Sequence, residues 1–174
     1  RPLGTAAFVR SVPLARLLLD AGADVNGAGE GGFTAMDSAK ESGEEAFAMA
    51  GVSHKDIDLA MIYDSFTYTV LITLESLGFC GPGEAGDWVL EGNAKLGSTL
   101  PMNTHGGLIR QAHLGAMHHI VEAALQLRGE ADDTARGGGN HKVPNAKLAI
   151  NTGSGGILAA TSALVLSSEP PSAA

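Results

Sequence analysis

Four of the six histidines of this chain lie within one short segment, NTHGGLIRQAHLGAMHH, at positions 103–119. They are His105, His113, His118 and His119. Imidazole rings bind transition metals, transfer protons near neutral pH, or take a structural place in a helix or a core. The sequence around each ring is the first guide to which of these three roles it takes.

A metal site built on one helix needs ligands at positions i and i+4, because that spacing places both side chains on the same face. His118 and His119 follow His113 at five and six residues, which turns them about 120–140° away from it. Met117 occupies the position where a partner of His113 belongs. We therefore expect no metal site here, and we predict that His118 and His119 lie along the flank of a helix.

His113 and His105 have contexts that favour chemistry. We expect His113 in the first turn of a helix over 112–128, where the helix dipole disfavours imidazolium and keeps the ring neutral, as a general base requires. His105 is flanked by Gly106 and Gly107, so the backbone can approach a ligand closely there. A structural histidine, on the surface or in the core, is the alternative for both rings, and spacing does not decide between these roles.

The elements that must position these side chains alternate between helices and strands. The nearly continuous apolar run at 57–63 is typical of a strand buried on both faces of a parallel or mixed sheet. A helix follows it directly, and the whole order indicates a layered α/β domain with a mixed sheet. The predicted helices are at 12–22, 37–52, 65–78 and 112–128, the last with Met117 and Val121 on its apolar face. The predicted strands are at 57–63, 147–151 and 156–166, and a tight turn within 152–156 joins the last two. A long loop is predicted at 80–103.

The composition excludes several classes of function. A formal charge of −8 over 174 residues argues against nonspecific nucleic-acid binding, which needs a basic surface. The chain shows no apolar run of the roughly 18 residues that a membrane span requires, and we expect no signal peptide. A single cysteine, Cys80, leaves no internal disulfide and favours a reducing, cytoplasmic setting.

Four short motifs occur in order along the chain: YDSF at 63–66, NTHGG at 103–107, QAHLG at 111–115 and NTGSGG at 151–156. They resemble the His-Asp-Cys-Phe, Asn-Pro-x-Gly-Gly, Gly-His-Pro and Asn-x-Gly-x-Gly-Gly motifs of the thiolase superfamily, in the family's own order. Over about 38–166 the chain resembles the C-terminal half of these enzymes. The sterol-carrier-protein type and its thiolase-like relatives resemble it most.

The resemblance implies a thiolase-like layered αβα half-domain that acts on CoA thioesters, either as a homo-oligomer or with a partner thiolase-type subunit. His113 corresponds by position to the family's catalytic histidine, whose segment also helps to form an oxyanion hole. The resemblance implies acyl-CoA as substrate and no bound cofactor. The substrate-binding positions that it implies are Asn103, His105, Gly106, Gly107, Gly153, Gly155 and Gly156.

Several residues depart from the family's pattern. Ser65 stands where the family has a proton-transfer cysteine, and a hydroxyl is a much poorer acid or base than a thiol near neutral pH. Tyr63 replaces the histidine of that motif, and Leu114 replaces the proline that follows the catalytic histidine. These changes resemble the branch that contains steroid side-chain aldolases, which makes Tyr63 and Asp64 candidates for proton transfer. As alternatives, Asp64 caps the helix that begins near Ser65, and Tyr63 belongs to the core.

The resemblance also sets the expected domain boundaries. We predict an N-terminal segment at 1–36, a thiolase-like domain at 37–168 and a disordered tail at 169–174. Residues 12–43 resemble part of an ankyrin repeat, yet a single repeat cannot bury its own apolar face. An ankyrin-type interaction protein is therefore the weaker interpretation.

Two functions from different classes follow. The first is an acyl-CoA enzyme domain. Its reaction is either acyl transfer, as in an acetyl-CoA acetyltransferase, or the cleavage or formation of a carbon–carbon bond. Such a domain needs a nucleophile-bearing N-terminal half. The second is a non-catalytic subunit that binds acyl-CoA, a lipid or another protein, and the missing family cysteines favour it. Cys80 is the remaining candidate nucleophile, and the alternative for this residue is a small buried hydrophobe.

Overall fold

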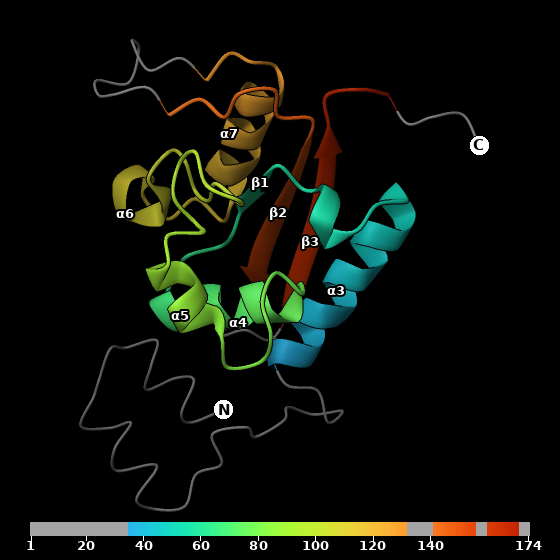
Figure 1. Cartoon of the computed structure of the whole chain (residues 1–174), viewed down its shortest axis with the longest axis vertical. Helices are drawn as coiled ribbons and strands as arrows, with labels where there is room; N and C mark the ends of the chain where they lie inside the picture. The colour runs from blue at the N-terminus through green and yellow to red at the C-terminus, as the bar shows by residue number, and fades with distance from the viewer. Residues whose placement is uncertain (1–34, 132–140, 156–159, 171–174) are drawn as a thin grey trace, which may run out of the picture.

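The computed structural model describes residues 35–131, 141–155 and 160–170 (Figure 1). The helix predicted at 12–22, most of the ankyrin-like stretch and Gly156 lie outside these residues. The strands are β1 (Leu59–Met61), β2 (Leu148–Gly155) and β3 (Ala160–Ser167). The helices are α3 (Ala35–Ala50), the short 3₁₀ helix η1 (His54–Asp56), α4 (Thr67–Ser76), α5 (Ala85–Leu90), α6 (Gly107–Gln111) and α7 (Met117–Leu127).

A mixed sheet in the order β1–β2–β3 forms the centre of the described part. β1 runs parallel to β2, with Leu59 opposite Ala149. β3 runs antiparallel to β2, with Val165 opposite Ile150. This sheet confirms the α/β class that the alternation of elements predicted.

β1 is buried on both faces of the sheet. Ala60 and Ile62 belong to a core shared with Leu74 of α4, against which α3 and α5 also pack. Leu59 and Met61 belong to a second core, shared with α7. The sheet therefore lies between two helical layers (Figure 1), which explains the continuous apolar run in the sequence.

The helix predicted over 112–128 begins later than expected. Ala112, Gly115 and Ala116 have φ values of 70°, 59° and 67°, and residues with positive φ cannot continue a right-handed helix. The chain forms α6 before this break and α7 after it, and His113 lies in the connection between them. The expectation that His113 occupies a first helical turn is therefore wrong.

Two other element boundaries differ from the prediction. The segment 80–103 contains a helix, α5, where only a loop was expected. β2 continues through Gly155, so 152–155 are paired strand residues and do not form the predicted tight turn. The small and hydroxyl side chains of TGSG fit a strand because its backbone pairs with β3 throughout.

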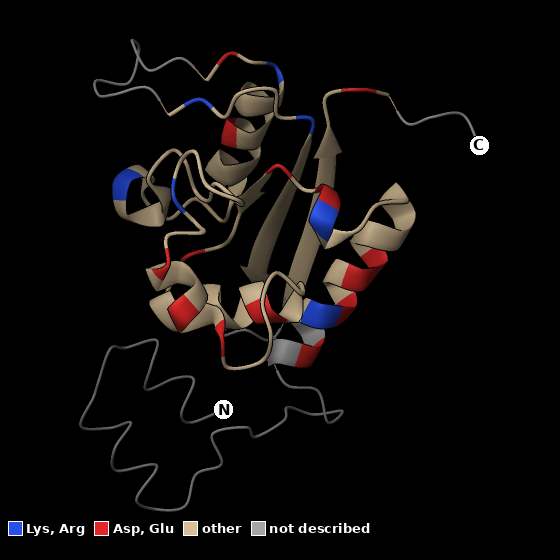
Figure 2. Cartoon of the chain, in the orientation of Figure 1, with Lys and Arg blue, Asp and Glu red and all other residues tan. Residues whose placement is uncertain are grey.

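Charged residues are found on the helices and the connecting segments, while the three strands carry none (Figure 2). α3 carries three exposed glutamates, Glu41, Glu44 and Glu45, while the basic residues are scattered. Within the described residues, no helix has the length and apolar character needed to cross a membrane.

The inward face of α7 is polar, contrary to the predicted apolar face. His119, Glu122 and Gln126 are almost completely buried, whereas Met117 and Val121 are 60% and 51% exposed. A polar residue can take such a position only if hydrogen bonds replace its contacts with water. The partners of these side chains come from three other segments of the chain, which contain Ile62 and Asp64, Thr104, and His141 and Val143.

Gln126 is the centre of this buried polar network. Its Nε2 lies within 3.0 Å of Thr104 Oγ1, Glu122 Oε1 and the His141 carbonyl oxygen. Its Oε1 accepts a hydrogen bond of 2.8 Å from Val143 N, and Thr104 Oγ1 donates to Glu122 Oε1 at 2.7 Å. α7 is thereby joined to the loop before α6 and to the segment before β2.

We expect Gln126→Leu to lower the free energy of unfolding by about 2–4 kcal/mol, because the buried Val143 N–H and the other partners lose a hydrogen bond. Urea unfolding followed by circular dichroism measures this loss. Val121→Leu, on the exposed side of the same helix, should change the value by less than about 0.5 kcal/mol. A Gln126→Leu protein as stable as the parent would show that the network does not hold α7.

Candidate functional site

Tyr63 links the end of the sheet to the connection between α6 and α7. Its backbone N donates to Thr152 Oγ1 of β2 at 3.0 Å. Its hydroxyl lies 3.2 Å from both Nδ1 and Nε2 of His113, and the two rings meet edge to face with centroids 5.8 Å apart. Two residues that the sequence analysis singled out separately therefore form one hydrogen-bonded pair.

The surroundings of this pair keep the phenol protonated. Burial, and then the negative charge of Asp64, raise the pKa of Tyr63 above its ordinary value. Tyr63 can therefore donate its O–H to an unprotonated nitrogen of His113 at neutral pH. Since His113 lies outside α7, the expected effect of the helix dipole on its ring does not apply, and the contact with Tyr63 is what the structure shows at this ring.

Asp64 does not cap α4, the alternative considered for it, and contacts α6 and α7. One of its oxygens accepts a hydrogen bond of 3.1 Å from Leu108 N, and the same oxygen lies 3.3 Å from His119 Nε2. Burial raises the pKa of the carboxyl, but the hydrogen bonds from His119 and Leu108 outweigh it, so the pKa is below its ordinary value. Asp64 is thus an ionised residue whose contacts hold the starts of α6 and α7.

Asn103 fastens the NTHGG loop to the end of β1. Its Oδ1 accepts from Ile62 N and its Nδ2 donates to the Ile62 carbonyl oxygen, both at 2.8 Å. Asn103 adopts φ 46°, a conformation that asparagine tolerates better than most residues. Its side chain is engaged with backbone, so its observed contacts give it a positional role beside the site.

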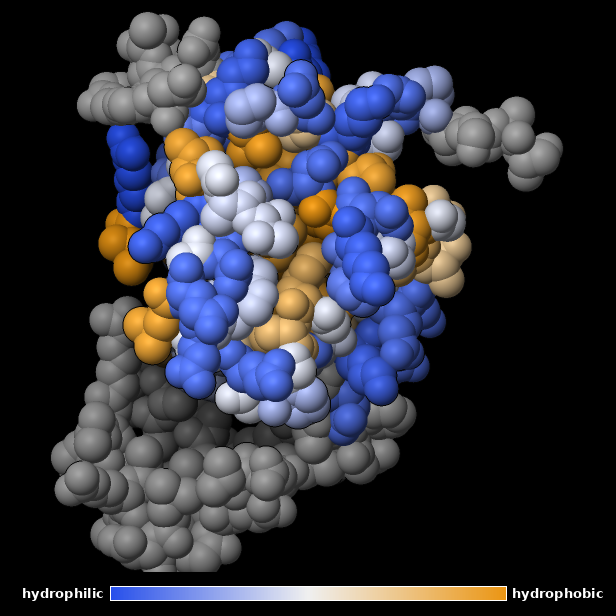
Figure 3. All heavy atoms as spheres, viewed as in Figure 1, coloured by the Kyte–Doolittle hydropathy of each residue, from blue (hydrophilic) through white to orange (hydrophobic). Residues whose placement is uncertain are grey.

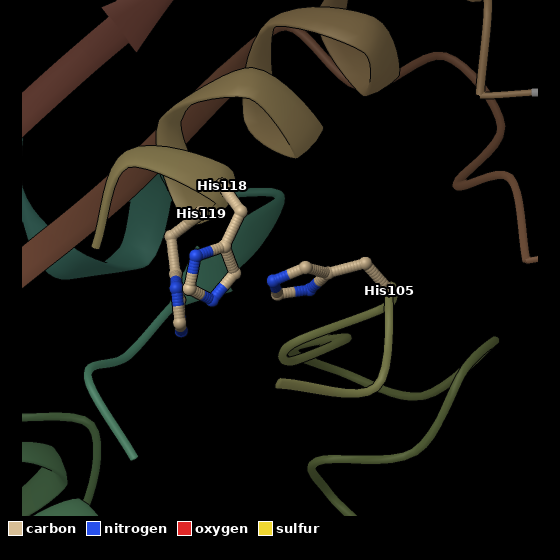
Figure 4. A group of neighbouring side chains, drawn as sticks. All are labelled: His105, His118 and His119. Carbon is tan, nitrogen blue, oxygen red and sulfur yellow. The ribbon is translucent and has the colours of Figure 1, made fainter. Parts of the chain in front are cut away.

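His105 extends from this loop toward His118 and His119 at the start of α7 (Figure 4). Its ring centroid lies 5.2 Å from that of His118 and 4.8 Å from that of His119. His105 and His119 are 3% and 0% exposed, so His119 is fully buried, whereas a partly buried or solvated place on the helix flank was expected for it and for His118. Spacing along one helix missed this cluster because His105 comes from a separate loop.

The remaining predicted residues surround this region. Gly153 borders a small hollow, partly open to solvent, together with Tyr63, Thr152 and hydroxyl side chains of β3 and α4. Gly155 ends β2 opposite Ala160. Ser65 is half-buried between β1 and α4.

Cys80 packs as a small hydrophobe. It is half-buried against the core that contains Leu74. Burial, and then the charges of Glu75 and Glu84, raise the pKa of its thiol. A thiol held in its neutral form is a poor nucleophile, which favours the structural alternative for this residue.

The mixed sheet between helical layers, with a Tyr-Asp pair after its first strand, is the arrangement expected of a thiolase-like half-domain. Residues 28–168 match the family described as thiolase C-terminal domain-like. The chain belongs to this family, which confirms the resemblance drawn from its four motifs.

The relatives include a carboxyl-CoA lyase, a sterol carrier protein and an aldolase. The chain is 42% identical over 95 residues to the 17-hydroxy-3-oxo-4-pregnene-20-carboxyl-CoA lyase of Mycobacterium tuberculosis, covering 55% of this chain and 25% of the lyase. It is 37% identical over 131 residues to sterol carrier protein 2 of Bos taurus, covering 72% and 23%. The solved Ltp2-ChsH2(DUF35) aldolase superposes with a TM-score of 0.65 at 33% identity, covering 74% and 31%. The chain thus spans about a quarter of the length of these curated relatives.

Gly107 provides a test of the contact at Asp64. It has φ +64°, and a Cβ placed on it would overlap the Asp64 carboxylate, whereas a Cβ on Gly51, at φ +67°, would meet nothing described within 4 Å. Both alanine variants carry a backbone cost of about 1–2 kcal/mol. We expect Gly107→Ala to lose about 1–3 kcal/mol more than Gly51→Ala in urea unfolding, because it is overpacked.

Repeating the comparison in an Asp64→Ala background isolates the steric contribution. The excess loss from Gly107→Ala should shrink there, since the overlapping carboxylate is gone. If Gly107→Ala still loses as much more stability than Gly51→Ala in the Asp64→Ala background, overlap with the carboxylate is not the cause of the loss.

Proposed function

We propose that this chain is the domain of a CoA-thioester lyase that cleaves a carbon–carbon bond by retro-aldol chemistry. The observation that carries the proposal is the 3.2 Å contact between the Tyr63 hydroxyl and the His113 ring. Ser65, which stands at the position of a family cysteine, favours cleavage over the cysteine-dependent acyl transfer of an acetyltransferase. The lyase and aldolase among the similar proteins support the same choice.

The pair accounts for both proton transfers of the reaction. His113 accepts the proton of a β-hydroxyacyl-CoA, the bond between Cα and Cβ breaks, and its electrons form an enolate on the thioester as the carbonyl product leaves. Tyr63 donates a proton to Cα of the enolate, which yields the shortened acyl-CoA. Passage of the first proton from His113 to Tyr63 restores both groups, so that no external acid, base or oxidant is consumed.

The neighbouring contacts support this assignment. Asp64 stays ionised and holds Leu108 and His119, which orients the connection that carries His113. The small hollow beside Tyr63 is bordered by Gly153, where the missing Cβ leaves room for the Ser162 hydroxyl to approach the backbone. Acyl-CoA is the proposed substrate, and the reaction as written uses no other bound cofactor.

A partner subunit or a second copy is part of the proposal. Ile109 of α6, Leu114 and Met117 are 97%, 60% and 60% exposed, and Figure 3 shows apolar surface on the side of the molecule where α6 lies. Exposed apolar side chains beside a site favour an interface. The cytoplasmic setting remains a prediction from the single cysteine.

The test is incubation of the chain with a β-hydroxyacyl-CoA and detection of the shortened acyl-CoA and the carbonyl product by mass spectrometry. We expect Tyr63→Phe and His113→Ala each to lower the rate by about 100-fold or more, the usual contribution of a general acid or base. His54→Ala, which changes a histidine beside Phe79, is the matched control and should keep the rate.

Calorimetry with acetyl-CoA separates the two classes of function. Binding without turnover would favour the non-catalytic acyl-CoA-binding subunit. Turnover that survives both substitutions would overturn the assignment of the pair. Light scattering in the same samples reports whether the active species is an oligomer.

A further inference from the structure

The cluster of His105, His118 and His119 contains buried polar atoms that lack partners. Both nitrogens of His105, both of His118 and Nδ1 of His119 are buried without a hydrogen bond to any described residue. Leaving such an atom unsatisfied costs about 1–3 kcal/mol. Five such atoms belong to one cluster of three rings, and the described protein atoms supply no hydrogen-bond partner for any of them.

The three rings converge closely enough to share one ligand. One nitrogen from each ring lies within 4.8 Å of one nitrogen from each of the others. Figure 4 shows His105 facing His118 and His119 across the space between the loop and α7. A tetrahedral ion with metal–nitrogen distances of about 2.0–2.1 Å holds its ligand nitrogens about 3.4 Å apart. Side-chain rotations must therefore shorten the longest nitrogen–nitrogen distance in the cluster by roughly an ångström.

His119 is already oriented as a ligand. Its Nε2 lies 3.3 Å from Asp64 Oδ1 and 3.2 Å from the Ile62 carbonyl oxygen. Both of these partners only accept hydrogen bonds, so Nε2 carries a proton and Nδ1 is the nitrogen of this ring that is available as a ligand. A carboxylate or carbonyl behind the metal-binding histidine is the usual outer shell of an imidazole–metal site.

The charges and protonation states also suit a cation. Burial, and then the neighbouring His119, lower the pKa of His105 to about 4, and burial lowers the pKa of His118. These rings are therefore neutral at pH 7, as metal ligands must be. Asp64 and Glu122 both lie near enough to influence the charge of His105, and their negative charges favour a positive ion between them.

We propose that His105, His118 and His119 bind one divalent transition-metal ion of the Zn²⁺ class. Imidazole nitrogens select zinc, cobalt, nickel, copper and iron over magnesium and calcium. Three protein ligands leave a fourth position for water or another small ligand. The proposal replaces the expectation of no metal site, which compared His118 and His119 with His113 alone, and it does not depend on the proposed lyase activity.

The test is calorimetric titration of the chelator-treated chain with Zn²⁺, together with the visible absorption of bound Co²⁺. We expect one ion per chain, and a Co²⁺ spectrum typical of a nitrogen-ligated site. His118 is the least buried of the three, so His118→Ala is the variant that tests the site with least risk to folding. It should abolish the Co²⁺ spectrum and weaken Zn²⁺ binding by at least 100-fold.

Two further variants distinguish this site from other histidines. Asp64→Asn keeps the ligands but removes the negative charge behind His119, and it should weaken binding about 10–100-fold. His54→Ala, outside the cluster, should bind like the parent protein. No binding by the parent chain, or binding equal in His118→Ala and His54→Ala, would overturn the proposal, and circular dichroism verifies that each variant is folded.

Discussion

The carboxylate of Asp64 is the junction on which this arrangement depends. It follows the end of β1 and accepts hydrogen bonds from Leu108 at the start of α6 and from His119 in the first turn of α7. Two residues earlier, the backbone of Ile62 is bound on both its N–H and its carbonyl by Asn103. The last residues of one buried strand thereby fix the loop and both helices that carry the histidines.

The polar inner face of α7 explains how so short a sheet supports this site. The buried polar atoms of Glu122 and Gln126 form hydrogen bonds with partners in the loop at Thr104 and in the segment at Val143. Hydrogen bonds depend strongly on direction, so such a network fixes the position of the loop more narrowly than apolar packing does. Met117 and Val121 of the same helix are left exposed on its outer side, while Ala123 packs into the core with Leu59 and Met61.

The sequence was sufficient to predict the layers but not the site geometry. The strand at 57–63 and the helices around it were predictable because burial on both faces leaves a continuous apolar run. The break before α7 was not, since it rests on left-handed Ala112 and Ala116, and alanine usually favours helix. The pairing of His105 with α7 was likewise hidden, because it depends on how the Asn103 loop docks in three dimensions.

Asp64 also couples the two parts of the site electrostatically. Its negative charge contributes to the raised pKa of the Tyr63 phenol, and it is bound to the imidazole of His119, whose ring centroid lies 6.4 Å from that of Tyr63. A divalent ion on the far side of His119 offsets part of that charge, because opposite charges at this range act against each other in a partly buried site. Metal binding should then lower the pKa of Tyr63 relative to the metal-free chain, and make its proton easier to release. Absorbance titration of the phenolate with and without Zn²⁺ measures this coupling, and an unchanged titration would mean that the histidine cluster and the Tyr63–His113 pair act independently.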